Sequence, residues 1–381
     1  MKPHLYYDIR DVLLAPARAF SAKAIFVMTT FLILALVVYD LGFYLAHLVD
    51  GAKLSVVYSV YGIFPGPSPA LSGAVGHVVF GIGVLAAIYA VMLGLLGVAV
   101  FTMEQIRGNR FFSVAESLRF IRSRAKQLLL CELALVAFVT LIVALFAIAG
   151  LLGRIPVVGE WLYSFFYVFP AYFIALFTVF IVAVFQISII LAPAAAAAER
   201  RGEIFGVILE TFSSIIRQPL RWGVYTIYAI VAGKLASFLY AYFAVRAVQF
   251  TNWAIGLTDG GKLAKLVESS LSHLPMRSDV VKETFNIFPG IDWGLDLLRF
   301  VRSGDSAASY VMAFMLFVIF ASILGYFMAV IGTGQAYAYV VIRYKKDGYR
   351  IDQEEPIGET EHLPGEPIVE PLTGEKDSQQ P

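Results

Sequence analysis

Lys234, Asp40 and Glu132 lie within or directly beside long apolar stretches of this chain, where chemistry within a membrane would have to occur. Lys234 lies about twelve residues into one stretch and Asp40 about sixteen residues into another, so at 1.5 Å per residue they lie at a similar depth. A lysine at the bilayer centre costs roughly 2.5–3.5 kcal/mol, and we expect a partner to offset this cost. We therefore predict an intramembrane ion pair between Asp40 and Lys234. Glu132, nearer the end of its stretch, is a second candidate for the same role.

Such a pair has two interpretations. It marks a proton or solute path, as in a transporter, or it holds the helices in register without further chemistry. Lys234 could instead extend its ammonium group into a wet crevice and need no carboxylate.

Other signals of chemistry are sparse. His47 and His77 lie at adjoining ends of one predicted hairpin, where two imidazoles could ligate a metal or haem, yet no further ligand accompanies them, and we expect solvated histidines at the interface. Residues 256–262 have the glycine and lysine spacing of a phosphate-binding loop, but Leu263 replaces the required Ser or Thr and no strand precedes it. We therefore predict no enzymatic activity and no cofactor.

Composition places the chain in a membrane. Of its 381 residues, 59% are hydrophobic and 15% are charged, whereas soluble domains are about 25% charged. Most of the apolar stretches reach the roughly 20 residues that cross a bilayer. The fold class is therefore an all-α polytopic membrane protein with about six transmembrane helices. The stretches are Ala24–Tyr39, Val78–Met103, Leu133–Gly153, Leu162–Ala198, Trp222–Phe250 and Ser306–Ile342.

Basic residues set the expected orientation. Fourteen Lys and Arg precede spans one, three and five, and only Lys53 and Arg154 lie in the two short loops on the other side. By the positive-inside rule, the protein is a multi-pass protein of the inner (plasma) membrane with both termini in the cytoplasm. We predict a membrane domain over 1–343, with an exported loop at about 251–305, and a disordered, acidic, Pro-rich cytoplasmic tail over 344–381.

A weak repeat underlies this layout. Residues 111–126 and 204–218 each place apolar side chains on one helical face, as do residues before span one. We therefore expect three hairpins, each preceded by a cytoplasmic amphipathic helix in the membrane plane. Their basic residues are candidate contacts for anionic lipid headgroups, and nucleic acid is not an expected partner. These candidates are Arg119, Arg122, Arg124, Lys126, Arg217 and Arg221.

Glycine and proline predict how the spans pack. Small residues in spans two and six should let helix backbones approach closely. They are Gly76, Gly81, Gly83, Gly94 and Gly97 in span two and Gly325, Ala329, Gly332 and Gly334 in span six. Pro170 should interrupt the fourth stretch, which is too long for one straight crossing.

Several short motifs carry a family resemblance in the second half of the chain. They are Ala192-Pro193 followed by Glu199, Phe212-Ser213-Ser214, Gln218-Pro219 and the ending Gly332 to Arg343 with Asp347-Gly348. With them the chain resembles uncharacterised polytopic bacterial inner-membrane proteins and, loosely, the membrane domain attached to some glycerophosphodiester phosphodiesterases. The resemblance implies an integral membrane fold and no established reaction, since this sequence lacks the soluble phosphodiesterase domain. It transfers no functional residue.

The features together favour a non-enzymatic protein that organises the membrane or serves as a subunit or scaffold of a membrane complex. The lipid bilayer is its expected partner, and the acidic tail offers a surface for a protein partner. A solute or lipid transporter using Asp40 and Lys234 is the alternative. The sequence pattern sets no oligomeric state.

Overall fold

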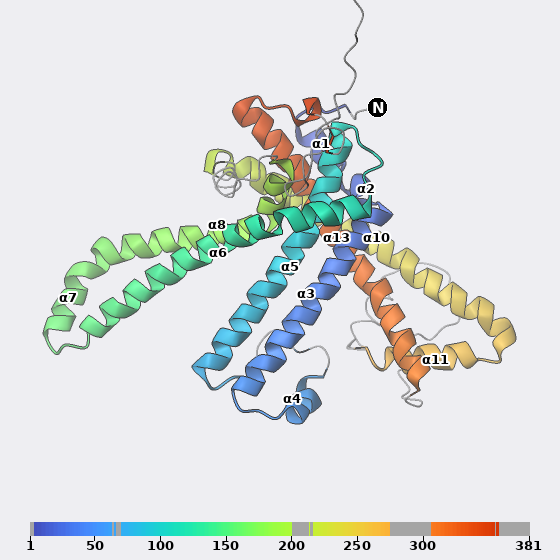
Figure 1. Cartoon of the computed structure of the whole chain (residues 1–381), viewed down its shortest axis with the longest axis horizontal. Helices are drawn as coiled ribbons and strands as arrows, with labels where there is room; N and C mark the ends of the chain where they lie inside the picture. The colour runs from blue at the N-terminus through green and yellow to red at the C-terminus, as the bar shows by residue number, and fades with distance from the viewer. Residues whose placement is uncertain are drawn as a thin grey trace, which may run out of the picture.

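The computed structural model describes residues 4–62, 65, 70–199, 213, 216–274, 306–354 and 356–357. The described residues form helices and no strands, and six helices are long and apolar enough to cross a membrane. Three arms of paired helices diverge from one packed centre (Figure 1). An all-α polytopic membrane protein is therefore confirmed.

The first arm pairs α3 (Ala22–Val49) with α5 (Ala74–Arg107), and the short α4 (Leu54–Tyr61) lies at its tip. The two long helices touch at glycines: an ideal Cβ on Gly83 would lie 2.7 Å from the Cα of Gly42. Only residues without side chains permit so close a crossing.

The second arm contains α6 (Val114–Leu152), α7 (Val158–Phe166), the π-helical segment η1 (Tyr167–Tyr172) and α8 (Phe173–Ala198). Ser113 and Glu116 form a capping box at the start of α6. The predicted interruption at Pro170 is confirmed, because Phe169 before it has the non-helical angles φ −140° and ψ 115°.

The third arm pairs α10 (Pro219–Asp259) with α13 (Ala307–Asp347), and α11 (Lys262–Leu271) packs against α13 through Val267, Leu271 and Leu316. Each long helix has 41 residues, so each is about 61 Å long, twice the thickness of the hydrocarbon core. The helix of span five continues nine residues past the expected Phe250 end, and the expected loop at 251–305 therefore begins later. Residues 275–305 lie outside the described part.

We call the packed centre the hub. It consists of α1 (Ile9–Leu13), α2 (Ala15–Ala19), residues 92–107 of α5, residues 191–198 of α8 and residues 326–342 of α13. Its glycines meet other helices as predicted: a Cβ on Gly334 would lie 2.7 Å from the Ala229 Cβ, and one on Gly94 would lie 2.8 Å from the Phe31 Cβ. The N-terminal helices α1 and α2 and the connection 108–113 between the first two arms lie at the hub (Figure 1).

A buried ionic network closes the hub. The Arg107 guanidinium, fully buried, donates to Glu104 at 2.9 Å and to Glu354 at 2.6 and 2.9 Å. Glu354 follows η2 (Ile351–Gln353), whose Ile351 is fully buried. The predicted start of the disordered tail at residue 344 is therefore too early, because α13 continues to Asp347. Residues 349–354 pack on the hub, where Ile351 is the apolar anchor and Glu354 supplies a carboxylate to the buried Arg107. Residues 358–381 lie outside the described residues.

The expected surface helix 111–126 is not a separate element. It forms the first part of the continuous 39-residue helix α6, because no Gly or Pro interrupts residues 114–149. Its packed face also differs from the predicted one: Ser117, Phe120 and Ile121 are buried, whereas Phe111 is 92% exposed. Before span one the chain forms the short helices α1 and α2, which are part of the hub. The third expected surface helix, 204–218, lies almost entirely outside the described residues.

Candidate functional site: an apolar cavity with a buried carboxyl

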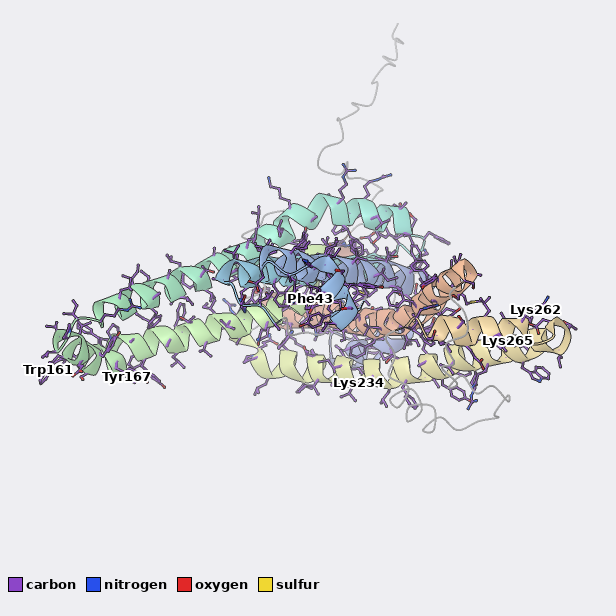
Figure 2. The ribbon with its side chains drawn as sticks, turned by 90° about the horizontal axis from the view of Figure 1, so that it is seen from below. Phe43, Trp161, Tyr167, Lys234, Lys262 and Lys265 are labelled. Atoms are coloured by element: carbon purple, nitrogen blue, oxygen red, sulfur yellow. The ribbon has the colours of Figure 1, made fainter. Side chains whose placement is uncertain are left out.

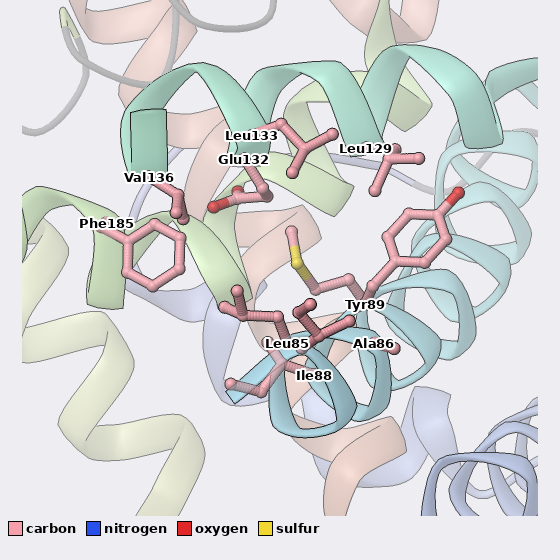
Figure 3. A pocket seen from close by; sticks show the side chains of 11 residues that line it. Leu85, Ala86, Ile88, Tyr89, Leu129, Glu132, Leu133, Val136 and Phe185 are labelled. Atoms are coloured by element: carbon pink, nitrogen blue, oxygen red, sulfur yellow. The ribbon is translucent and has the colours of Figure 1, made fainter. Parts of the chain in front are cut away.

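A cavity of about 370 Å³ lies between α5, α6 and α8 (Figure 3). Its volume falls within the range of small-molecule sites, roughly 300–1,000 Å³. Apolar side chains from all three helices line it, and Glu132 of α6 supplies the carboxyl group. Labelled lining residues include Leu85, Ala86, Ile88, Tyr89, Leu129, Leu133, Val136 and Phe185.

The cavity results from how α6 crosses α5. The side chain of Ile121 packs directly on Gly97 of α5, where it would lie only 2.9 Å from a Cβ at that position. One turn further along α6, the Tyr89 hydroxyl donates to the Ala125 carbonyl at 2.8 Å. Beyond this contact the second arm diverges from the first (Figure 1). The diverging helices leave a space that Leu129, Leu133 and Val136 line without filling.

The cavity opens towards the surface that would face lipid. Ile82 and Leu133 at its edge are 63% and 46% exposed, and both are apolar. An aqueous mouth would be lined by polar groups, so this opening suits an apolar ligand that enters from the bilayer.

Glu132 is the polar element of the cavity. It is 8% exposed, and its carboxyl group lies 2.9 and 3.1 Å from the Ser188 Oγ of α8. The same hydroxyl lies 2.7 Å from the Phe185 carbonyl. The Ser188 hydroxyl therefore shares its proton between the Glu132 carboxyl group and the Phe185 carbonyl, and no cation pairs with Glu132 within the described chain.

The structure does not bring Asp40 and Lys234 together. Lys234 is exposed midway along α10, apart from α3 and its Phe43 (Figure 2). Asp40 of α3 is half-buried, and its buried Oδ1 has no hydrogen-bond partner. The pairing prediction fails because α3 packs mainly on α5 and α13, whereas α10 packs mainly on α13 and α11. Equal depth in the sequence does not imply adjacent helices.

The candidate headgroup residues separate into two groups. Arg124 is 5% exposed, lies 5.6 Å from the Phe120 ring and donates to Gln127, so it belongs to the protein interior and is not a headgroup contact. The other five are exposed, as a headgroup contact requires. They are Arg119, Arg122, Lys126, Arg217 and Arg221.

His47 and His77 do not form a metal site in the structure. His47 is 5% exposed rather than solvated, and it packs 4.5 Å from Phe43 and 5.4 Å from Tyr61, measured between ring centroids. His77 is exposed and contacts the Gly73 carbonyl at 2.9 Å. Across the described ranges, no group of three or more His, Cys, Asp or Glu could hold a metal ion.

The sequence indicated Glu132 as a candidate but did not indicate its hydrogen-bond partner, Ser188. Ser188 is a polar residue within the apolar stretch of α8, and this was the available signal. That it faces Glu132, 56 positions earlier, follows only from the packing of α6 on α8.

Comparisons with protein-family models, with curated proteins and with solved structures find no match for this chain. The resemblance to bacterial inner-membrane proteins and to the membrane domain of glycerophosphodiester phosphodiesterases therefore stays a prediction.

Proposed function

We propose that this protein is a non-enzymatic integral membrane protein that binds a lipid hydrocarbon chain between α5, α6 and α8 and organises the bilayer around its diverging arms. The cavity with Glu132 carries the proposal. Its lining is apolar, it opens between apolar side chains, and its one carboxyl group could orient a ligand with a polar end.

The arms support contact with lipid over much of their length. Only 11% of the most apolar window of α6 and of α10 is buried inside the protein, against 56% for α5. Trp161 and Tyr167 are 64% and 73% exposed at the tip of the second arm (Figure 2), where aromatic side chains favour the boundary between lipid and water. The transporter alternative relied on Asp40 and Lys234, and the structure does not assemble that pair.

The orientation belongs to the proposal. With the hub in the cytoplasm, the exposed Arg119, Arg122 and Lys126 face the anionic leaflet, and the arm tips lie on the exported side. We place the protein in the inner membrane on the same ground. Residues beyond 357 carry the acidic charge that could recruit a protein partner.

Photolabelling tests the cavity. The full chain, reconstituted in nanodiscs with a phospholipid that carries a diazirine on one acyl chain, should be labelled mainly on α5, α6 and α8 around Glu132. Ala86→Trp should fill the space and reduce this labelling, whereas Val78→Trp, at an exposed position of α5 outside the cavity, should not. Labelling spread evenly over the three arms, or unchanged by Ala86→Trp, would refute the proposal.

A further inference from the structure

A second, polar cavity of about 100 Å³ lies at the hub, apart from the apolar one. It forms where the α2–α3 junction meets the last turns of α5, the connection 108–113 and Thr333 of α13. A volume of this order suits one phosphate group and is too small for a nucleotide, since drug-sized ligands need roughly 300 Å³ or more.

The charged residues that line this cavity are all basic. Arg18, Lys23 and Arg110 line it, and no Asp or Glu does. Lys23 donates to the Phe112 carbonyl at 2.9 Å and keeps two further protons for another acceptor. The charge of Lys23 also acts on Glu116, but that carboxylate is held in the capping box, where it accepts from the Ser113 N–H at 2.5 Å. Three cations thus meet at one cavity without a carboxylate among its lining residues.

Backbone geometry adds donors at the same place. Ser21 is the N-cap of the 28-residue helix α3, and its side chain makes no capping hydrogen bond. Ser21, Lys23 and Ala24 line the cavity, so the unsatisfied N–H groups of the first turn of α3 lie beside it. The positive end of the helix dipole favours an anion here. The buried hydroxyls of Thr102 and Thr333 also line the cavity, although the Thr102 hydroxyl already donates to the Val98 carbonyl at 3.1 Å.

We propose that this basic pocket binds a phosphate group, supplied either by an anionic phospholipid headgroup or by free inorganic phosphate. The inference goes beyond the proposed function, because it concerns a different cavity, a different ligand chemistry and the hub end of the molecule. Basic pockets between transmembrane helices on the cytoplasmic side are suited to phosphate-bearing headgroups.

The test uses the full chain in phosphatidylcholine nanodiscs. In the first experiment, a small fraction of phosphatidylglycerol is added, and its enrichment around the protein is measured by native mass spectrometry. In the second experiment, inorganic phosphate is added without anionic lipid, and the shift in melting temperature is measured. Enrichment of phosphatidylglycerol in the first experiment identifies a lipid headgroup as the ligand, and a shift in melting temperature in the second identifies free phosphate.

Variants locate the effect. Arg18→Gln and Arg110→Gln should each weaken binding about fivefold, the effect expected for one charge near the surface. Gln105→Glu places a negative charge in the pocket without removing a basic residue, and it should also weaken binding. This variant keeps the test decisive if Arg18→Gln or Arg110→Gln does not fold. Lys262→Gln, exposed at the start of α11, outside the pocket and away from the hub, should leave binding unchanged.

Two results would overturn the inference. Wild-type binding in the folded Gln105→Glu protein would show that the pocket holds no phosphate, and equal loss in Lys262→Gln would show that only general surface attraction operates. Ala86→Trp, which fills the apolar cavity, should change neither the enrichment of phosphatidylglycerol nor the shift in melting temperature. Failure of the acyl-chain proposal and failure of the phosphate proposal therefore remain distinguishable.

Discussion

At the residue scale, polar groups in this protein act mainly by completing local hydrogen bonding. Glu132 and Ser188 satisfy each other between two helices in an apolar setting. Asp50, at the tip of the first arm, accepts from Ser72 and Gly73 at the start of α5. A carboxylate at a helix N-terminus is favourable because it meets free N–H groups and the positive end of the dipole.

Removing Ser188 should expose the dependence of Glu132 on it. Ser188→Ala leaves a buried carboxyl group without its partner and should lower the free energy of unfolding by about 1–3 kcal/mol. Adding Glu132→Leu should recover much of the loss, because no buried polar group then remains unpaired. Thermal unfolding in detergent measures both, with Thr140→Ala, an exposed hydroxyl on α6, as the control. Strictly additive losses would contradict the coupling.

Asp50 should make stability depend on acid. Hydrogen bonds from the Ser72 N–H and hydroxyl, and from the Gly73 N–H, hold the pKa of Asp50 below its usual value. Its contribution is therefore complete above the unfolded pKa, about 3.9, and is lost as pH falls through the lower folded pKa. We expect Asp50→Asn to lower the melting temperature at pH 7 and to lower it less at pH 2–3. An equal difference at both pH values would contradict the capping role.

At the element scale, close contacts between small residues determine which helices pair. The crossing of α3 and α5 at Gly42 and Gly83 holds the first arm together, and Gly325 of α13 admits Thr29 of α3 in the same way. Pairing in the second arm is looser, because α6 and α8 make fewer close contacts than α3 and α5 do; these contacts include Glu132 with Ser188 and Phe138 with Phe177. The apolar cavity lies where these two modes of packing meet.

Gly83→Leu should separate the first arm. A side chain at this position would overlap the Gly42 backbone, and overpacking costs about 1–3 kcal/mol or more when backbone must move. Gly81→Leu on the same helix is the matched control, since a Cβ there meets nothing within 4 Å. Unfolding midpoints in detergent should fall for Gly83→Leu only. Similar midpoints for the two variants would show that the glycine contact is not needed.

At the scale of the whole molecule, the hub carries the packing and the arms carry the contact with lipid. Residues from both ends of the chain meet there: the Tyr7 hydroxyl donates to Asp352, and the Tyr7 ring lies 4.1 Å from that of Tyr344. Burial and Asp352 both raise the pKa of Tyr7, so this phenol stays protonated as a donor. Arg107 joins α5 to the segment after α13 through Glu354.

Truncation should reveal how much the last described segment stabilises the hub. A chain ending at Gly348 loses Glu354 and leaves Arg107 with one carboxylate instead of two, so the free energy of unfolding should fall by about 3 kcal/mol. A chain ending at Gly358 keeps this contact and should melt like the full protein. Equal melting temperatures for the two truncations would show that residues 349–358 are dispensable for the hub.

Topology reporters test the orientation of the whole molecule. Fusions at Gly108 and Gly358, which flank hub elements, should both report the cytoplasm, and a fusion at Ser270 near the tip of the third arm should report the exported side. The expectation follows from the fourteen-to-two distribution of basic residues. A cytoplasmic signal at Ser270 would invalidate the six-span orientation.

The amino-acid sequence by itself determined the membrane class, the six spans, the interruption at Pro170 and the use of glycines for helix packing. Each of these depends on local composition or on the absence of a side chain, and both are visible in one stretch of sequence. Glu132 was also identifiable, because a carboxylate in an apolar run needs a partner wherever the helix goes.

Only the tertiary structure decided which distant residues meet. Asp40 and Lys234 share a depth but lie on helices that do not pack together, whereas Arg107 and Glu354, 247 positions apart, form a buried ion pair. The apolar cavity and the basic pocket depend on the angle at which α6 crosses α5 and on the path of the α2–α3 junction. Hydrophobic pattern sets which faces are buried, but the choice of neighbour depends on shape complementarity between whole helices, which no single stretch encodes.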